Sequence, residues 1–285
     1  MDTDLLFDEE AGGAHEAALY RPGAIAERIS VEEALGEDAK RHYDEHGWLA
    51  VRGLFGPAEV ATALEAVDDL ICGRVPGFRG RIYEASVRPR LAAMSEAERY
   101  DAVRKLFRFV AHEARTRALS EQPAMIAIVR NLLGHATPRL FQDMALLKPP
   151  LIGREKPWHQ DHAFFDFPLD TRFLGVWIAL DPATIENGCM QVLDRGHQAG
   201  PRIHFRRRDF QICDTDVLGH RSVAFPLEPG DAMFFDGLLP HGTPANDSPL
   251  RRRALQFHYC PAEAAELESG FRLQVFGSEG KDATC

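Results

Sequence analysis

Cysteine, long apolar runs and a basic leader are scarce or missing in this chain of 285 residues. The five cysteines are odd in number and form no close pair, so they predict neither a disulfide framework nor a thiolate metal site. Cys189 and Cys260 lie in apolar runs and are expected to be small core residues. No stretch approaches the roughly 18 apolar residues of a membrane helix. The acidic start, Met1-Asp2-Thr3-Asp4, lacks the basic region of a signal peptide, which predicts a cytoplasmic protein.

Positive charge is also in deficit. The formal net charge is −10, which argues against a general nucleic-acid binder. A basic cluster runs from Arg202 to Arg208 and is expected to be a solvated face. The alternative is that some of these arginines reach over a cavity and bind an anionic group of a substrate. The length, the 45% hydrophobic content and the absence of repeats or Gly/Ser linkers fit one globular domain, and nothing indicates an oligomeric state.

The most informative motif that is present is His159-Gln160-Asp161. The aromatic surroundings predict a strand followed by a turn at Asp166-Phe167-Pro168, and a strand would direct His159 and Asp161 to one side. His241 follows a short buried run and supplies a second imidazole. Two imidazoles and one carboxylate leave metal positions open, as non-haem Fe(II) oxygenases require.

The two-residue spacing alone is weak, because a surface histidine beside an acid gives the same pattern. A second match, His42-Tyr43-Asp44, lies in a stretch from Glu33 to His46 that is predicted to be helical. Residues two apart on a helix point in different directions, so this second match is expected to be chance.

Arg252 opens a predicted strand in which alternate side chains face opposite ways. Leu255 and Phe257 are expected to pack under helices, so Arg252, Gln256 and His258 share the face toward the cavity. A buried guanidinium is costly unless an anion meets it, and it suits a carboxylate through two parallel hydrogen bonds.

Taken together, the motifs resemble the phytanoyl-CoA dioxygenase (PhyH) family of Fe(II)- and 2-oxoglutarate-dependent oxygenases. The likeness extends from about residue 40 to about residue 262. It rests on these segments: Gly47 to Phe55, Trp158 to Asp161, Val176 to Asp181, Glu186 to Met190, Pro229 to Ala232, His241 to Thr243, and Arg252 with Arg253. Two departures stand out. Asp194 to His197 replaces a turn that is more often Pro-Gly-Ser-His, and the family's upstream basic contact to co-substrate is not assigned within Arg79 to Arg90.

The resemblance implies a site and a reaction. Iron would bind to His159, Asp161 and His241, and Arg252 would pair with the distal carboxylate of 2-oxoglutarate. Further contacts to the co-substrate would come from Gln160, Met144, Trp177 and Thr243, although Met144 and Trp177 suit an apolar core equally well.

The implied enzyme oxidises, most readily hydroxylates, an unactivated C–H bond of a small molecule with O2, while 2-oxoglutarate gives succinate and CO2. Related halogenases have a small residue in place of Asp161, so its presence favours hydroxylation or another oxidation, and desaturation, cyclisation and epimerisation stay open. The alternatives are a cupin-like metalloenzyme that does not use 2-oxoglutarate and a non-catalytic binding relative. The substrate itself is not indicated.

The expected fold is α+β, a double-stranded β-helix (jelly roll or cupin-like barrel) with flanking, mostly N-terminal helices. Residues 1–30 would form a partly ordered arm, and residues 31–285 one domain that is helical to about residue 137 and a barrel over about 138–262. A strand is predicted from Trp48 to Arg52, and three helices are predicted: Pro57 to Ile71, Ser95 (with a Glu98 capping box) through Phe107, and Ser120 to Gly134. The segment from Arg74 to Arg90 is either a mobile lid or an ordinary surface loop.

Overall fold

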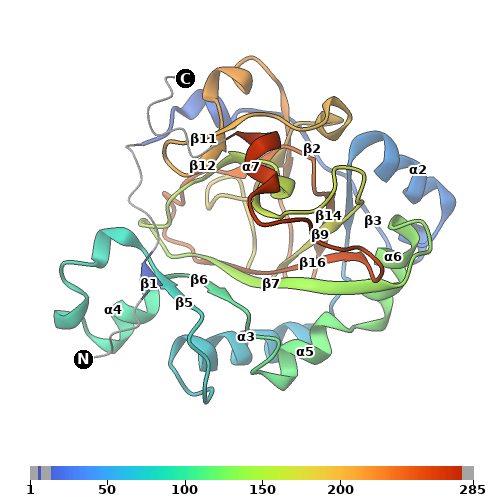
Figure 1. Cartoon of the computed structure of the whole chain (residues 1–285). Coiled ribbons are helices and arrows are strands. Elements are labelled where there is room, and N and C mark those ends of the chain that lie inside the picture. The colour runs from blue at the N-terminus through green and yellow to red at the C-terminus, as the bar shows by residue number, and fades with distance from the viewer. Residues whose placement is uncertain (1–5, 8–13, 278–285) are drawn as a thin grey trace.

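The computed structural model describes residues 6–7 and 14–277, and it consists of two facing sheets (Figure 1). The larger sheet has, in spatial order, β1 (Leu6–Phe7), β5 (Arg81–Tyr83), β6 (Val103–Phe107), β7 (Pro138–Lys148), β16 (Arg252–Pro261), β9 (Leu174–Ala179), β14 (Ala232–Asp236), β4 (Trp48–Val51) and β3 (Arg28–Ile29). The smaller sheet has β2 (Pro22–Ile25), β13 (Ser222–Phe225), β10 (Met190–Val192), β15 (His241–Thr243) and β8 (Lys156–His159). A two-stranded ribbon, β11 (His204–Arg206) and β12 (Phe210–Ile212), forms a separate sheet, and β12 packs beside β8. The expected double-stranded β-helix is confirmed.

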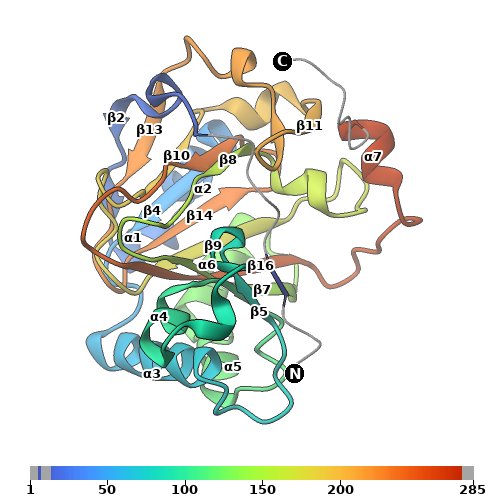
Figure 2. The ribbon, with the colours of Figure 1, turned by 90° about the vertical axis from the view of Figure 1, so that its left-hand side faces the viewer.

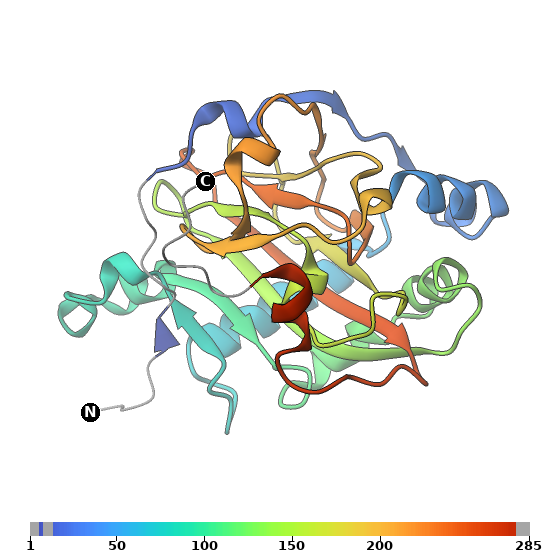
Figure 3. The ribbon, with the colours of Figure 1, turned by 45° about the horizontal axis from the view of Figure 1, so that its top comes forward.

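Helices cover the outer face of the larger sheet. Figure 2 shows α3 (Pro57–Ile71), α4 (Glu96–Asp101) and α5 (Ala114–Ser120) on the side away from the smaller sheet. The remaining helices are α1 (Val31–Ala34), α2 (Glu37–His46), α6 (Pro123–Leu132) and α7 (Phe271–Phe276), the last of which packs on the 3-10 turn Asp161–Phe164 (Figure 3).

Alternate side chains of β16 pack into two separate hydrophobic cores. Leu255 and Phe257 belong to the core under the helices, together with Val67 of α3, as predicted. Ala254 points the other way, into the core between the sheets, where it joins Trp177. This second layer is therefore where the inward side chains of β16, including Arg252, come to lie.

Two helix predictions were wrong at one end. The capping box of Ser95 and Glu98 forms, but the helix ends at Asp101, and Val103–Phe107 is strand β6. Pairing of β6 with β7, a partner distant in sequence, decides this segment and local helix signals do not. Ser120 is the last residue of α5 and not a cap.

The other predicted helices and the first predicted strand agree more closely with the structure. The helix Pro57–Ile71 and the strand from Trp48 are confirmed. The predicted helix from Glu33 to His46 is divided into α1 and α2 near Gly36. Asp44 pairs with Arg172 at 2.9 Å, so the second His-x-Asp match forms ordinary surface contacts.

Residues before the barrel also contribute to it. β2 pairs with β13, and β3 pairs with β4, so residues 22–29 belong to the sheets. Residues 1–5 and 8–13 of the expected arm, and Cys285, lie outside the described residues. Cys189 and Cys260 are buried, as predicted. Within residues 6–7 and 14–277, no helix combines the length and the apolar character that crossing a bilayer requires.

The turn before β14 depends on Gly230. Its φ is +93°, and a Cβ there would lie 2.2 Å from the carbonyl oxygen of Phe55. Gly230→Ala is expected to lower the unfolding free energy by about 1–2 kcal/mol for the left-handed backbone and by a further 1–3 kcal/mol, roughly, for the forced contact. Gly219→Ala is the control, because Gly219 has φ +91° but no atom within 4 Å of its built Cβ. Urea denaturation should show the larger loss for Gly230→Ala, and equal losses would contradict this view of the turn.

Candidate metal centre and its cavity

The two histidines of the site face each other across a pair of strands. His159 of β8 and His241 of β15 are register partners, and their ring centroids are 4.2 Å apart. The Nδ1 of His159 lies 2.8 Å from the carbonyl oxygen of Pro157, and that of His241 lies 2.9 Å from the carbonyl oxygen of Leu239. A carbonyl can only accept, so each Nδ1 carries the proton. Each Nε2 is left with a free lone pair, as a metal ligand needs.

Asp161 is the third residue of the metal group, and it lies in a 3-10 turn and not in the predicted strand. Strand β8 ends at His159, and a 3-10 turn begins at Asp161, so the prediction of a strand up to a turn at Asp166 was wrong. Gln160 is still extended (φ −111°, ψ 133°), which preserves the alternation for one more residue. Asp161 Oδ1 therefore lies 3.4 Å from His159 Nε2 and 3.6 Å from His241 Nε2. The three donors fall within 4.8 Å of one another.

Protonation states in the folded protein suit a cation. Burial lowers the pKa of His159 to about 3 and also lowers the pKa of His241. Burial alone would raise the pKa of Asp161, but the neighbouring histidines outweigh it and hold that pKa well below its usual value. Two neutral imidazoles and one carboxylate bind a divalent metal without first losing protons. The donor set fits iron with open positions.

Gln160 points away from this group. Its Nε2 donates to the carbonyl oxygens of Gly200 at 2.9 Å and Leu238 at 2.6 Å, and its Oε1 accepts from the backbone of Arg202 at 2.7 Å. All of its amide atoms are thus engaged on the far side of the motif. Its contact with a co-substrate stays a prediction. These hydrogen bonds fix the position of the backbone between His159 and Asp161.

The backbone N–H of Gln160 donates to Nε2 of the buried His204 at 3.0 Å, while Nδ1 of His204 lies 2.8 Å from the carbonyl oxygen of Arg202. Burial lowers the pKa of His204 from 6.5 to about 4. The unfolded chain then binds a proton at a pH where the folded chain does not. The contribution of His204 to the free energy of unfolding is therefore fully present above about pH 6.5 and is lost as the pH falls toward about 4.

Glutamine in place of His204 can offer an oxygen where Nε2 stood, without titrating. Between about pH 7 and about pH 4.5, wild type is expected to lose about 2 kcal/mol more unfolding free energy than His204→Gln. Urea denaturation at the two pH values measures the difference. A loss of the same size in both proteins would contradict the assignment.

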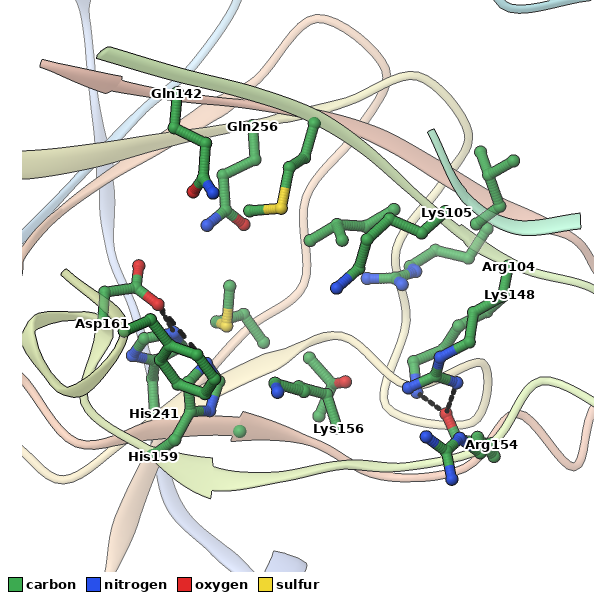
Figure 4. Close-up of a pocket in the computed structure, with 18 of the residues that line it drawn as sticks. Arg104, Lys105, Gln142, Lys148, Arg154, Lys156, His159, Asp161, His241 and Gln256 are labelled. Carbon is green, nitrogen blue, oxygen red and sulfur yellow. Dashed lines mark hydrogen bonds and ion pairs between the residues drawn. The ribbon is translucent and has the colours of Figure 1, made fainter. Parts of the chain in front are cut away.

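The metal group opens into a cavity between the sheets. The empty space at this site is about 840 Å³, open solvent at its mouth included. Met144, Thr243 and Arg252, three of the expected co-substrate contacts, line it. Phe164 and Phe165 form part of its apolar wall. Figure 4 shows the metal group at one end and basic side chains across from it.

Arg252 is buried, with 2% exposure, and its Nε and Nη1 have no hydrogen-bond partner among the described residues. Its guanidinium carbon lies 5.2 Å from the ring centroid of Trp177, which supports it through a cation–π contact. Burial lowers the pKa of Arg252 to about 10. Trp177 itself does not line the cavity, so it supports Arg252 from behind. An arginine in this state requires an anion.

Several basic side chains in the cavity were not anticipated. They are Arg104, Lys105, Lys148, Arg154 and Lys156, and Asp161 is the single acidic residue that lines the cavity in the part of the chain that the structure describes. Two of them lie on β6, which the sequence predicted as helix. The segment Val103-Arg104-Lys105-Leu106-Phe107 shows no apolar–polar alternation that could have revealed them. No residue from Arg79 to Arg90 lines the cavity.

The basic cluster from Arg202 to Arg208 stands outside the cavity. Arg208 is buried and bonds with Glu155 at 2.7 Å and Asp214 at 2.5 Å, so it is neither a solvated face nor a substrate contact. The altered turn from Asp194 to His197 does not line the cavity either.

Comparisons with known proteins agree with this geometry. The rat phytanoyl-CoA dioxygenase domain-containing protein 1 is 32% identical over 173 residues, which cover 58% of this chain and 59% of the rat protein. EvdO2 from Micromonospora carbonacea var. aurantiaca, solved with 2-oxoglutarate, is 25% identical with a TM-score of 0.62, over 82% of this chain and 94% of EvdO2.

The epimerase SnoN from nogalamycin biosynthesis, solved with Fe3+, alpha ketoglutarate and nogalamycin RO, shares the fold. It has a TM-score of 0.67 at 22% identity over 84% of this chain and 88% of SnoN. The family profile described as phytanoyl-CoA dioxygenase (PhyH) matches residues 43–254, a range that includes His159, Asp161, His241 and Arg252. The chain therefore belongs to the phytanoyl-CoA dioxygenase family.

Proposed function

We propose that this protein is an Fe(II)- and 2-oxoglutarate-dependent dioxygenase that hydroxylates an unactivated C–H bond of a small molecule. One observation carries the proposal: Arg252, buried and short of partners, lines the same cavity as His159, Asp161 and His241. The site thus offers a metal position and a carboxylate position in one enclosure. Family membership and the 2-oxoglutarate bound in EvdO2 support the same co-substrate.

Each residue of the site would have a separate role in this proposal. His159, Asp161 and His241 would hold iron, which, when bound, supplies the chemistry that couples decarboxylation of 2-oxoglutarate to oxidation of the substrate. Arg252 would fix the distal carboxylate of 2-oxoglutarate through its guanidinium fork.

Lys105 would supply the upstream basic contact that the sequence left open. It stands on β6, and its amine points into the cavity (Figure 4). Met144 and Thr243 would border the co-substrate, because both line the cavity. Phe164 and Phe165 would exclude water from the reacting groups.

The substrate in this proposal carries an anionic group. Six basic residues and one acid line the cavity. Burial, with Arg252 and Arg104 nearby, lowers the pKa of Lys148 well below its usual value, so its charge is not counted. A divalent metal with a dianionic co-substrate leaves the remaining excess of positive charge unchanged. Lys156 is partly neutralised by Asp209 at 2.6 Å, and Arg104 by Glu84 at 3.3 Å, but neither partner lines the cavity. Turnover of a carboxylate or phosphate substrate should exceed that of its neutral ester. Equal rates for the two compounds would contradict the proposal that the substrate carries an anionic group.

Succinate formation tests the reaction class. Purified protein with Fe(II), O2 and 2-oxoglutarate, screened against cell metabolites, should release succinate and CO2. Oxidation of a substrate without any need for 2-oxoglutarate would identify a cupin-like metalloenzyme of another class. Binding of metal and 2-oxoglutarate with no succinate from any substrate would identify a non-catalytic relative.

A further inference from the structure

His258 is a buried histidine that touches the metal group without lining the cavity. It lies on β16, two residues after Gln256, and has 0% exposure. Its Nε2 lies 2.7 Å from Oδ2 of Asp161. An ionised carboxylate can only accept, so His258 donates this hydrogen bond. The sequence placed His258 on the face of Arg252 but gave it no role.

The two oxygens of Asp161 consequently have separate surroundings. Oδ1 faces the bare Nε2 atoms of His159 and His241, where a metal would sit. Oδ2 faces His258, on the other side of the carboxylate. Rotation of Asp161 to present both oxygens to a metal would break the bond to His258 and leave a buried donor without a partner.

The surroundings of His258 leave its ring few alternatives. The rings of Phe141 and Phe165 each have their centroids 5.7 Å from that of His258. Its Nδ1 has no partner among the described residues, and its Nε2 also lies 3.2 Å from Nε2 of Gln256. An amide NH2 can only donate, so a proton on His258 Nε2 requires the Gln256 amide to turn its oxygen toward that nitrogen. The ring is therefore packed in place with its donor aimed at Asp161.

We infer that His258 is a positioning residue that holds Asp161 so that only Oδ1 is offered to the metal. The inference rests on the proposed function, because it presumes a metal at this site. An octahedral metal with two imidazoles and one carboxylate oxygen keeps three positions free. A chelating 2-oxo acid uses two of them, and one remains. A carboxylate bound through both oxygens would occupy that last position.

A pair of variants isolates the hydrogen bond from the packing. Glutamine places an amide N–H at about the position of the histidine Nε2, whereas methionine has similar length and no donor. Anaerobic titration with Co(II), followed by visible absorbance, should show about 10- to 100-fold weaker binding for His258→Met. His258→Gln should stay within about threefold of wild type, because the donor is retained.

A second probe reports on the free position. Nitric oxide should bind the Fe(II)–2-oxoglutarate complex of wild type and of His258→Gln, and more weakly that of His258→Met. A purely structural role would lower the thermal midpoints of both variants and would not separate their affinities. Equal Co(II) affinity in wild type and His258→Met would overturn the inference and leave the proposed function standing. Failure of wild type itself to bind Co(II) would instead refute the proposed function.

Discussion

Replacement of Asp161 by asparagine is expected to abolish metal binding while leaving the fold intact. The change removes the one negative charge of the site, and a neutral amide oxygen is a much poorer partner for a divalent cation. The loss should exceed the roughly 10- to 100-fold cost of losing an outer hydrogen-bond partner of a ligand. Anaerobic Co(II) or Fe(II) titration measures it, and succinate formation should fall to background. The thermal midpoint of the metal-free protein should hold, because a buried charge has been removed.

Asp143→Asn is the matched control. Asp143, on β7 of the larger sheet, is likewise a buried aspartate, and it accepts hydrogen bonds from the backbone of Phe109 at 2.6 Å and Val110 at 3.1 Å. It does not line the cavity. This variant should lose stability and keep its metal affinity. Metal binding of wild-type strength in Asp161→Asn would mean that the ion is held elsewhere.

Arg252→Met should weaken 2-oxoglutarate binding by about 100-fold or more, in line with the 2–5 kcal/mol, roughly, that truncating one member of a buried charge pair costs. Metal affinity should not change, since Arg252 is not a ligand. The variant without ligands should be at least as thermally stable as wild type, because the guanidinium is buried and two of its nitrogens have no partner within residues 6–7 and 14–277. Calorimetry of 2-oxoglutarate binding to Ni(II)-loaded protein and thermal unfolding provide the two measurements.

The next residue supplies the control for Arg252. Arg253 lies on the other face of β16 and forms a paired contact with Asp181, from Nε to Oδ2 and from Nη2 to Oδ1, both at 2.9 Å. Arg253→Met should therefore lower stability and leave 2-oxoglutarate affinity unchanged, the reverse of the pattern for Arg252→Met. Unchanged affinity in Arg252→Met would deprive Arg252 of its assigned role.

The metal ligands and Arg252 could be predicted because each depends on local alternation. His159 and Asp161 end on one side since Gln160 stays extended, although the strand itself stops earlier than expected. Arg252 faces inward because Leu255 and Phe257 face outward. In these segments the nearest neighbours in sequence decide where a side chain points.

The basic wall could not be predicted in the same way. Lys105 follows a correct capping box, and the local signals favour continued helix, but pairing with Leu146 of β7 makes the segment a strand. The contact between His258 and Asp161 likewise joins residues 97 positions apart. Such arrangements depend on which strands become neighbours, and the sequence pattern of one segment does not contain that information.

Anomalous diffraction from crystals grown anaerobically with Fe(II) and 2-oxoglutarate can test whether one metal ion sits among His159, Asp161 and His241 with a carboxylate at Arg252. We expect a single iron peak bonded to both Nε2 atoms and to Oδ1 of Asp161, with the distal carboxylate of 2-oxoglutarate on the guanidinium of Arg252. Iron bound at any other place, or 2-oxoglutarate bound away from Arg252, would contradict this arrangement.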